Sequence, residues 1–139
     1  KDEGFLDTSN PYILSEPKPW RRLKTADSER VVPLVGEALW SAQRATDASC
    51  NDYLFPNYCD GNQVKSNSAS SALNKWLKAN VSKDIVVHSL RHAMRDRLRA
   101  VECPANIIDQ IGGWSRTGGG ESYGLGCQGE QLQRWMGSI

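Results

Sequence analysis

The sequence lacks any long apolar run. No stretch approaches the roughly 18 consecutive apolar residues that a membrane-spanning helix requires, although 39% of the 139 residues are hydrophobic. A chain of this length and composition can form one domain with a hydrophobic core and is short for two. We therefore expect one soluble domain that acts in the cytoplasm, away from membranes.

An excess of charge of either sign is also lacking. The 17 Lys and Arg residues nearly balance the 16 Asp and Glu residues, which leaves a formal net charge of +1. A net charge this small gives no reason to expect a polyanion as partner. An interaction with nucleic acid would have to depend on local clusters of cations.

Cysteines are few and are not arranged in pairs. Their spacings match neither a C-x-x-C zinc site nor a compact disulfide framework, and no apolar signal segment precedes them. We therefore expect free thiols in a reducing cytoplasm. The four cysteines are Cys50, Cys59, Cys103 and Cys127.

Two further classes of site lack essential residues. His88 and His92 have the spacing of metal-binding histidines on a helix, but the glutamate of an H-E-x-x-H motif is missing and no third ligand has a suitable spacing. The glycine run 118–120 is not followed by the Lys and Ser or Thr of a phosphate-binding loop. We therefore expect neither a metal nor a nucleotide cofactor.

The patterns that are present predict an α+β fold that is mostly helical. Short β-branched and aromatic runs within residues 11–34 predict a small antiparallel sheet, with strands near 12–14, 20–24 and 30–34 and a turn at 25–29. A helical part follows over about residues 36–139. Its expected helices span 36–47, 69–80, 90–101 with Ser89 as N-cap, a short segment between Pro104 and Gly112-Gly113, and 130–136, whereas the turn-rich residues 49–63 are expected to form a loop.

Three of these helices carry apolar residues on one face. We expect the three faces to bury one another and to form a single core. The inward residues are Ala69, Ala72, Leu73, Trp76 and Leu77 on the first helix, Leu90, Ala93, Met94, Leu98 and Val101 on the second, and Ile107, Ile108 and Ile111 on the third.

Cations gather at two places in the sequence. Arginines recur every four residues on the helix 90–101 and share one stripe, with two histidines at its amino end. A second group lies on the predicted hairpin. Either group alone is more typical of a solvated polar face, but if both face one groove, phosphate contact is the better explanation, because arginine forks match phosphate oxygens. The stripe consists of Arg91, Arg95 and Arg99 with His88 and His92, and the hairpin group of Lys18, Arg21, Arg22 and Lys24.

Three motifs, taken in order, resemble the conserved boxes of the tyrosine recombinases, the family of phage integrases and bacterial chromosome-dimer resolvases. His88-Ser-Leu-Arg-His resembles the H-x-L-R-H box, and Ile111-Gly-Gly-Trp-Ser is similar to the L-G-H/W-S box. Tyr123 follows at an interval typical of the family. Upstream, residues 22–34 resemble the hairpin that carries the family's catalytic lysine, so that the resemblance spans about residues 22–135.

The resemblance implies a site-specific recombinase that cleaves and rejoins DNA through a 3′-phosphotyrosyl intermediate. The Tyr123 hydroxyl would attack the scissile phosphate, Arg91 would stabilise charge on the pentacoordinate phosphorus, and Lys24 would protonate the leaving 5′ oxygen. His88 would assist proton transfer or orient the phosphate, and Trp114 would donate its indole N–H or pack behind the site. Because the phosphotyrosine retains the energy of the broken bond, religation would require neither ATP nor a metal.

The same resemblance implies double-stranded DNA as the partner and self-association into a tetramer on DNA. It also implies a bacterial, nucleoid-associated protein encoded by a prophage or another mobile element. The residues expected to bind DNA around the catalytic ones are Arg21, Arg22, His92, Arg95 and Arg99.

The chain departs from the family pattern because it has no T-G-x-R-x-x-E segment, which supplies an earlier arginine of the phosphate clamp. It also opens at Lys1 with no initiator Met. We therefore expect residues 1–139 to be the carboxyl-terminal part of a catalytic domain from a longer protein, inactive alone and with residues 118–123 displaced when no DNA is bound. Two alternatives stay open, a non-catalytic DNA-binding or interaction fragment and a type IB topoisomerase-like enzyme.

Overall fold

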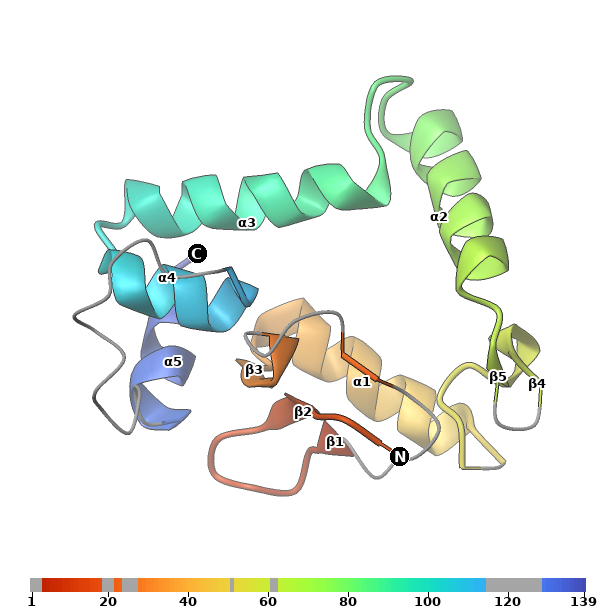
Figure 1. Cartoon of the computed structure of the whole chain (residues 1–139), viewed down its shortest axis with the longest axis horizontal. Helices are drawn as coiled ribbons and strands as arrows, with labels where there is room; N and C mark the ends of the chain where they lie inside the picture. The colour runs from red at the N-terminus through yellow and green to blue at the C-terminus, as the bar shows by residue number, and fades with distance from the viewer. Residues whose placement is uncertain (1–3, 19–21, 24–27, 51, 61–62, 115–128) are drawn as a thin grey trace.

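The computed structural model describes residues 4–18, 22–23, 28–50, 52–60, 63–114 and 129–139. Its elements confirm the expected α+β class with mostly helical content (Figure 1). In chain order they are β1 (Gly4–Phe5), β2 (Tyr12–Ser15), β3 (Arg30–Pro33), α1 (Gly36–Ala48), the 3-10 helix η2 (Pro56–Tyr58), β4 (Cys59–Asp60), β5 (Gln63–Val64), α2 (Ser66–Asn80), α3 (Val87–Ala100), α4 (Ala105–Gly112) and α5 (Gly129–Met136).

The three-stranded sheet is antiparallel and has the order β1-β2-β3. β2 pairs with β3 along its whole length, so that Ser15 lies opposite Arg30. The strand expected at 20–24 is not observed at residues 22 and 23, and residues 19–21 and 24–27 lie outside the described part. That prediction was wrong for residues 22 and 23 because β2, rather than the segment after it, is the antiparallel partner of β3.

The hydrophobic core lies around α4, which contacts α3 and β3, while α5 also packs on β3 (Figure 1). Leu98 of α3, Ile111 of α4 and Leu132 of α5 are at most 1% exposed. Burial of one such side chain stabilises the fold by about 1.5–3 kcal/mol. The expected apolar face of α4 is confirmed. The buried cluster is completed by Cys103, Ile107 and Ile108, and Met94, Val101, Trp114, Trp135, Met136 and Ile139 pack against it.

Two polar features hold the elements around this core. α3 ends in a reversal in which Glu102 adopts a left-handed φ of 58° and the Cys103 N–H donates to the carbonyl of Leu98 at 3.0 Å. The reversal lets α4 return beneath the carboxyl half of α3 (Figure 1). On the other side, Nε2 of Gln133 in α5 donates to the carbonyl of Leu34 at 2.9 Å. The predicted last helix is thereby fastened to the end of the sheet.

The apolar faces of α2 and of the amino half of α3 are not buried, in contrast to the expectation. Leu73 is 51% exposed, Trp76 58% and Leu90 55%, and Ala72 and Ala93 are exposed as well. Within α2, Leu77 is the buried residue. Figure 1 shows the reason: α4 lies under the carboxyl half of α3, whereas α2 runs to the side from the amino end of α3, beyond the reach of α4. Of α3, therefore, only the carboxyl half contributes to the core.

The region 49–63 contains more regular structure than a loop. β4 pairs with β5 in an antiparallel hairpin, with Cys59 opposite Val64 and Asp60 opposite Gln63. The Asp60-Gly61 sequence that predicted a loop is equally typical of the turn of a hairpin, and residues 61–62 lie outside the described part. The prediction of a loop was therefore wrong for this short hairpin.

The amino end of α3 begins earlier than expected. Val86 is the N-cap, and Ser89 lies inside the first turn, where its Oγ accepts a hydrogen bond from the Val86 N–H at 3.2 Å. Ser89 is therefore not the N-cap, although it does satisfy a backbone donor there. The Val87 N–H donates to Oδ1 of Asn74 in α2 at 2.8 Å. Because this donor has no partner within α3, the contact with Asn74 fixes the start of α3 against α2.

None of the described helices is both long enough and apolar enough to cross a lipid bilayer. The described cysteines, Cys50, Cys59 and Cys103, do not take part in disulfide bonds. Cys127 lies outside the described residues.

Candidate functional site

One face of α3 carries five of the predicted site residues. Their positions recur at helical spacing, so the side chains project from the same side of the helix. The two arginines nearest the core are partly buried, and the other three residues are exposed. The adjoining face of the helix is held in the core through Met94 and Leu98. The five residues are His88, Arg91, His92, Arg95 and Arg99, of which Arg91 and Arg95 are the partly buried pair.

The turn that ends α4 brings Trp114 against this face. Gly113 adopts the left-handed conformation, with φ 62° and ψ 42°, and its N–H donates to the carbonyl of Asp109. The Trp114 N–H donates to the same carbonyl at 3.0 Å. Glycine is favoured at such a helix end because it has no Cβ to clash. The turn folds the indole over Gly112, which is buried beneath it.

The indole ring of Trp114 contacts two of the arginines. The guanidinium carbon of Arg91 lies 4.3 Å from the ring centroid, and that of Arg95 lies 4.9 Å from it. Each cation–π contact of this kind is worth about 0.5–1 kcal/mol at an exposed site and more when water is excluded. The ring therefore holds two positive groups together despite their mutual repulsion. This placement corresponds to packing behind the site, one of the two roles expected for Trp114, and the role itself stays a prediction.

The two arginines differ in their acidic partners. Nη2 of Arg95 lies 3.7 Å from Oδ1 of Asp109, and its Nε is buried without a hydrogen-bond partner in the described part of the chain. Among the described residues, no carboxylate lies within ion-pair distance of Arg91. A partly buried guanidinium without an acidic partner is available to an anion, and phosphate oxygens match its paired donors.

A third arginine, Arg30 at the start of β3, was not among the predicted site residues. Its Nε donates to the carbonyl of Ile111 at 3.1 Å, and its Nη1 donates to the carbonyl of Ser28 at 2.9 Å. Partial burial and, after it, the positive charge of Arg91 lower the pKa of Arg30 below the ordinary value of an arginine. Its only signal in the sequence was its place before Val-Val-Pro-Leu, which indicated a strand and no site.

The other three residues of this face of α3, His88, His92 and Arg99, are exposed. The rings of His88 and His92 meet edge to face, with centroids 4.9 Å apart. Nη1 of Arg99 lies 3.7 Å from Oδ1 of Asp96, and both side chains are largely exposed. An exposed pair of this kind contributes little to stability. These side chains can therefore turn toward a polyanion at small cost.

The second predicted cation group is described only in part. Nζ of Lys18 lies 2.5 Å from Oε1 of Glu16, and Arg22 is exposed. Arg21, Lys24 and Tyr123 lie outside the described residues, as do residues 118–122. The convergence of the two cation groups on one groove therefore stays a prediction, as does the position of the nucleophile.

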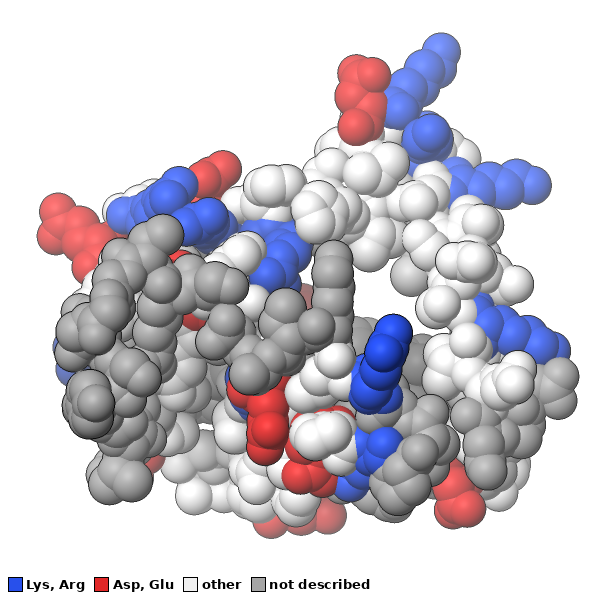
Figure 2. Space-filling model, viewed as in Figure 1, with Lys and Arg blue, Asp and Glu red and all other residues white. Residues whose placement is uncertain are grey.

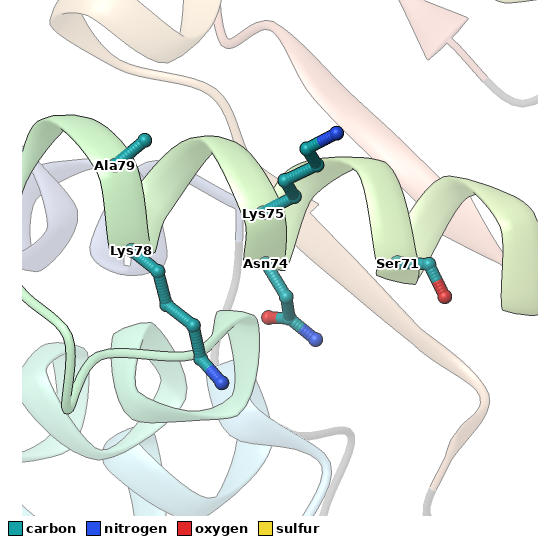
Figure 3. A pocket seen from close by; sticks show the side chains of 5 residues that line it. All are labelled: Ser71, Asn74, Lys75, Lys78 and Ala79. Atoms are coloured by element: carbon teal, nitrogen blue, oxygen red, sulfur yellow. The ribbon is translucent and has the colours of Figure 1, made fainter.

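Among the described residues on the face shown in Figure 2, Lys and Arg do not gather into a single dense patch. Lys and Arg side chains are spread along α3 and α2 and are interspersed with acidic ones. A shallow hollow of about 570 Å³ lies on α2, lined by Ser71, Asn74, Lys75, Lys78 and Ala79. Figure 3 shows Asn74 and Lys78 pointing to one side of α2 and Lys75 to the other. None of the predicted site residues lines this hollow, and no group of three or more metal-ligating side chains occurs among the described residues.

Comparison with known proteins identifies the family. Residues 6–123 match the family model described as "Phage integrase family". Because this match covers most of the sequence, the chain belongs to the phage integrase family. No curated protein and no solved structure matches the chain. The resemblance carried by the sequence motifs is therefore confirmed for the family, and the matched region ends at Tyr123.

Proposed function

We propose that this chain belongs to a tyrosine-type recombinase that cleaves and rejoins DNA through a 3′-phosphotyrosyl intermediate. Membership of the phage integrase family supports site-specific recombination in general. The observation that carries the finer proposal is the placement of Arg91, which is held against Trp114 without an acidic partner among the described residues. A cation fixed in this way is suited to stabilising charge that develops on a phosphate.

The proposed reaction assigns one step to each residue. The Oη of Tyr123 attacks the phosphorus, the bond from phosphorus to the 5′ oxygen breaks, and Lys24 gives a proton to that oxygen. Arg91 neutralises the non-bridging oxygens of the pentacoordinate phosphorus, and His88 takes up or directs the phenolic proton. Religation reverses these steps with a 5′ hydroxyl as nucleophile. The bond energy is kept in the phosphotyrosine, so the cycle consumes no ATP.

The surrounding cations fit contact with the DNA backbone. Arg95, Arg99 and His92 lie on the same face of α3 as Arg91, and we propose that they bind neighbouring phosphates together with Arg21 and Arg22. Such contacts make affinity fall steeply with salt concentration. We further propose double-stranded DNA as the partner, a tetramer on DNA as the active assembly, and a bacterial, nucleoid-associated protein of a mobile element.

We also propose that residues 1–139 are the carboxyl-terminal part of the catalytic domain and do not recombine DNA alone. The sequence contains no T-G-x-R-x-x-E segment, so the transition state would have only Arg91 and Lys24 as strong cations. A longer protein would supply the other arginine and further phosphate contacts.

The proposal is tested by trapping the covalent intermediate. The longer protein is incubated with a duplex nicked beside the scissile phosphate, and adduct is measured on a denaturing gel for the wild type and for Tyr123→Phe. We expect an adduct from the wild type and none from Tyr123→Phe, with little change in DNA affinity, because the variant removes only the nucleophilic oxygen.

The other outcomes of this experiment separate the alternatives. Tight DNA binding without any adduct would indicate a non-catalytic DNA-binding protein. Relaxation of supercoiled DNA without paired recombination sites would indicate a topoisomerase-like enzyme. An adduct formed by Tyr123→Phe would show that another residue is the nucleophile.

A further inference from the structure

Arg30 connects the sheet to the helix end on which Trp114 depends. Its two hydrogen bonds join the carbonyl of Ser28 to that of Ile111, which lies 81 residues further along the chain. Ile111 is in the last turn of α4, where carbonyl groups have no partner within the helix. Because a cation at this end also opposes the negative pole of the helix, Arg30 caps α4 from a distant strand.

The residues after Ile111 explain why such a cap is needed. Gly112 and Gly113 follow directly and lead to Trp114. Two successive glycines allow many backbone conformations, so the position of the indole depends on the contacts that hold the end of α4 as well as on its own packing over Gly112. The guanidinium of Arg30 is bonded to the Ile111 carbonyl, immediately before the two glycines, and so restricts the backbone at the point where they begin.

We propose that Arg30 is a positioning residue of the phosphate site: by fixing the last turn of α4, it keeps the Trp114 indole against Arg91 in the orientation that binds phosphate. This inference rests on the proposed function, because it assumes that Arg91 meets a DNA phosphate. Arg30 acts through Trp114 and Arg91, and its own Nε and Nη1 are already bonded to backbone carbonyls.

The electrostatics of the site agree with this role. Arg30 is partly buried, and it lies close enough to Arg91 for the positive charge of Arg91 to disfavour the charged form of Arg30. Two neighbouring guanidinium groups without a described carboxylate between them are destabilising in the free protein. An anion bound at Arg91 removes that repulsion, so the arrangement favours phosphate over an empty site.

The test is a double-mutant cycle on this chain. Affinity for a short fluorescent duplex is measured at low ionic strength for the wild type, Arg30→Gln, Arg91→Gln and the double variant. Arg44→Gln is the control for loss of charge, because it removes the same charge from an arginine that contacts the Trp40 indole, 4.9 Å from the ring centroid, and has no bond to Ile111. The orientation of Trp114 is followed by its indole N–H signal in NMR spectra, assigned from its disappearance in Trp114→Phe.

We expect Arg30→Gln to weaken binding by at least about threefold more than Arg44→Gln, and we expect this difference to vanish when Arg91 is already replaced. The Trp114 signal should move in Arg30→Gln and stay in place in Arg44→Gln. Arg30→Lys keeps the charge but cannot form the same pair of hydrogen bonds to the carbonyls of Ser28 and Ile111. Its Trp114 signal should therefore also move, and its affinity for the duplex should stay below that of the wild type. Thermal unfolding curves ensure that every variant is compared while folded.

Three results would overturn the inference. These are equal effects of Arg30→Gln and Arg44→Gln, independent effects of Arg30→Gln and Arg91→Gln, and an Arg30→Lys protein with wild-type affinity and an unmoved Trp114 signal. Failure of the proposed function gives a different result, in which Arg91→Gln binds the duplex as well as Arg44→Gln does. In that case the Trp114 signal of Arg30→Gln still reports whether Arg30 orients the indole.

Discussion

A β-carbon on Gly112 would lie 1.8 Å from Cζ3 of Trp114, so the indole occupies the space of the side chain that Gly112 lacks. No contact this short is possible between carbon atoms that are not bonded, and the neighbouring backbone is helical. The Arg91 and Arg95 contacts of the ring therefore depend on a glycine at this position.

Gly112→Ala should displace the indole. We expect the displaced ring to leave Arg91 and the free energy of unfolding to fall by about 1–3 kcal/mol, the usual cost of overpacking a buried site. Urea unfolding and the indole N–H signal measure both effects. Gly129→Ala is the control, because a Cβ there meets no atom within 4 Å. An unchanged indole signal in Gly112→Ala would show that the ring does not depend on this glycine.

Two leucines of α3 should differ sharply when truncated. Leu98 is 0% exposed and Leu90 is 55% exposed, although both lie on the apolar face predicted from periodicity. We expect Leu98→Ala to cost about 2–5 kcal/mol, because it leaves a cavity in the core, and Leu90→Ala to cost less than about 1 kcal/mol. Equal losses of unfolding free energy would mean that the amino half of α3 is covered in solution.

Asn74→Ala should weaken the start of α3. The substitution removes the acceptor of the Val87 N–H, and the loss of such a cap costs about 0.5–2 kcal/mol. Hydrogen exchange of the Val87 amide should accelerate more than that of amides in α4. Asn80→Ala serves as control, because Nδ2 of Asn80 donates only to an exposed carbonyl of its own helix. Equal exchange rates in the two variants would contradict this assignment.

Arg91→Ala should impair chemistry more than binding in the longer protein. We expect the cleavage rate on a nicked duplex to fall by about 10² to 10³, by analogy with removal of one preorganised charge-stabilising donor. Arg97→Ala on the same helix is the control, since Arg97 is exposed and lies away from the cationic face. A loss of less than about tenfold for Arg91→Ala would place the phosphate elsewhere.

Lys24→Ala should be rescued by a substrate with sulfur in place of the 5′ bridging oxygen. A thiolate leaves without protonation, so the general acid is no longer needed. Single-turnover cleavage of the oxygen and sulfur substrates is compared for Lys24→Ala and for Lys83→Ala, in which an exposed lysine outside the site is removed. Rescue of another variant, with none for Lys24→Ala, would reassign the acid.

The sequence predicted helices well where a face meets a partner, as at Ile107, Ile108 and Ile111. It failed at Leu73, Trp76 and Leu90, because periodicity shows which face of a helix is apolar and does not show whether another element lies against that face. Arg91 and Trp114, which the family motifs singled out, are in contact, and their roles stay predictions. The motifs did not predict how the contact is made.

The site residue that was missed illustrates the same limit. Arg30 contacts Ile111 across 81 residues, and no local pattern can signal a side chain that caps a helix so far away. The Gly112-Gly113 pair did predict the end of α4, because a left-handed turn requires such residues. The direction in which Trp114 then folds depends on tertiary packing, which only the structure shows.

The residues around β3 that contact α4 and α5 are far from these helices in the sequence, and this distance affects how the molecule can fold. The hydrogen bond between Gln133 and Leu34 spans 99 residues, and that of Arg30 spans 81. During synthesis at about 5–20 residues per second, β3 would wait roughly 5–20 s for α5 to be made. Contacts between residues so far apart in the sequence slow folding, because the entropy of closing a long loop is lost before the contacts form. The hydrogen bond of Arg30, which lies beside Arg91 and Trp114, therefore cannot form until the end of α4 has been made.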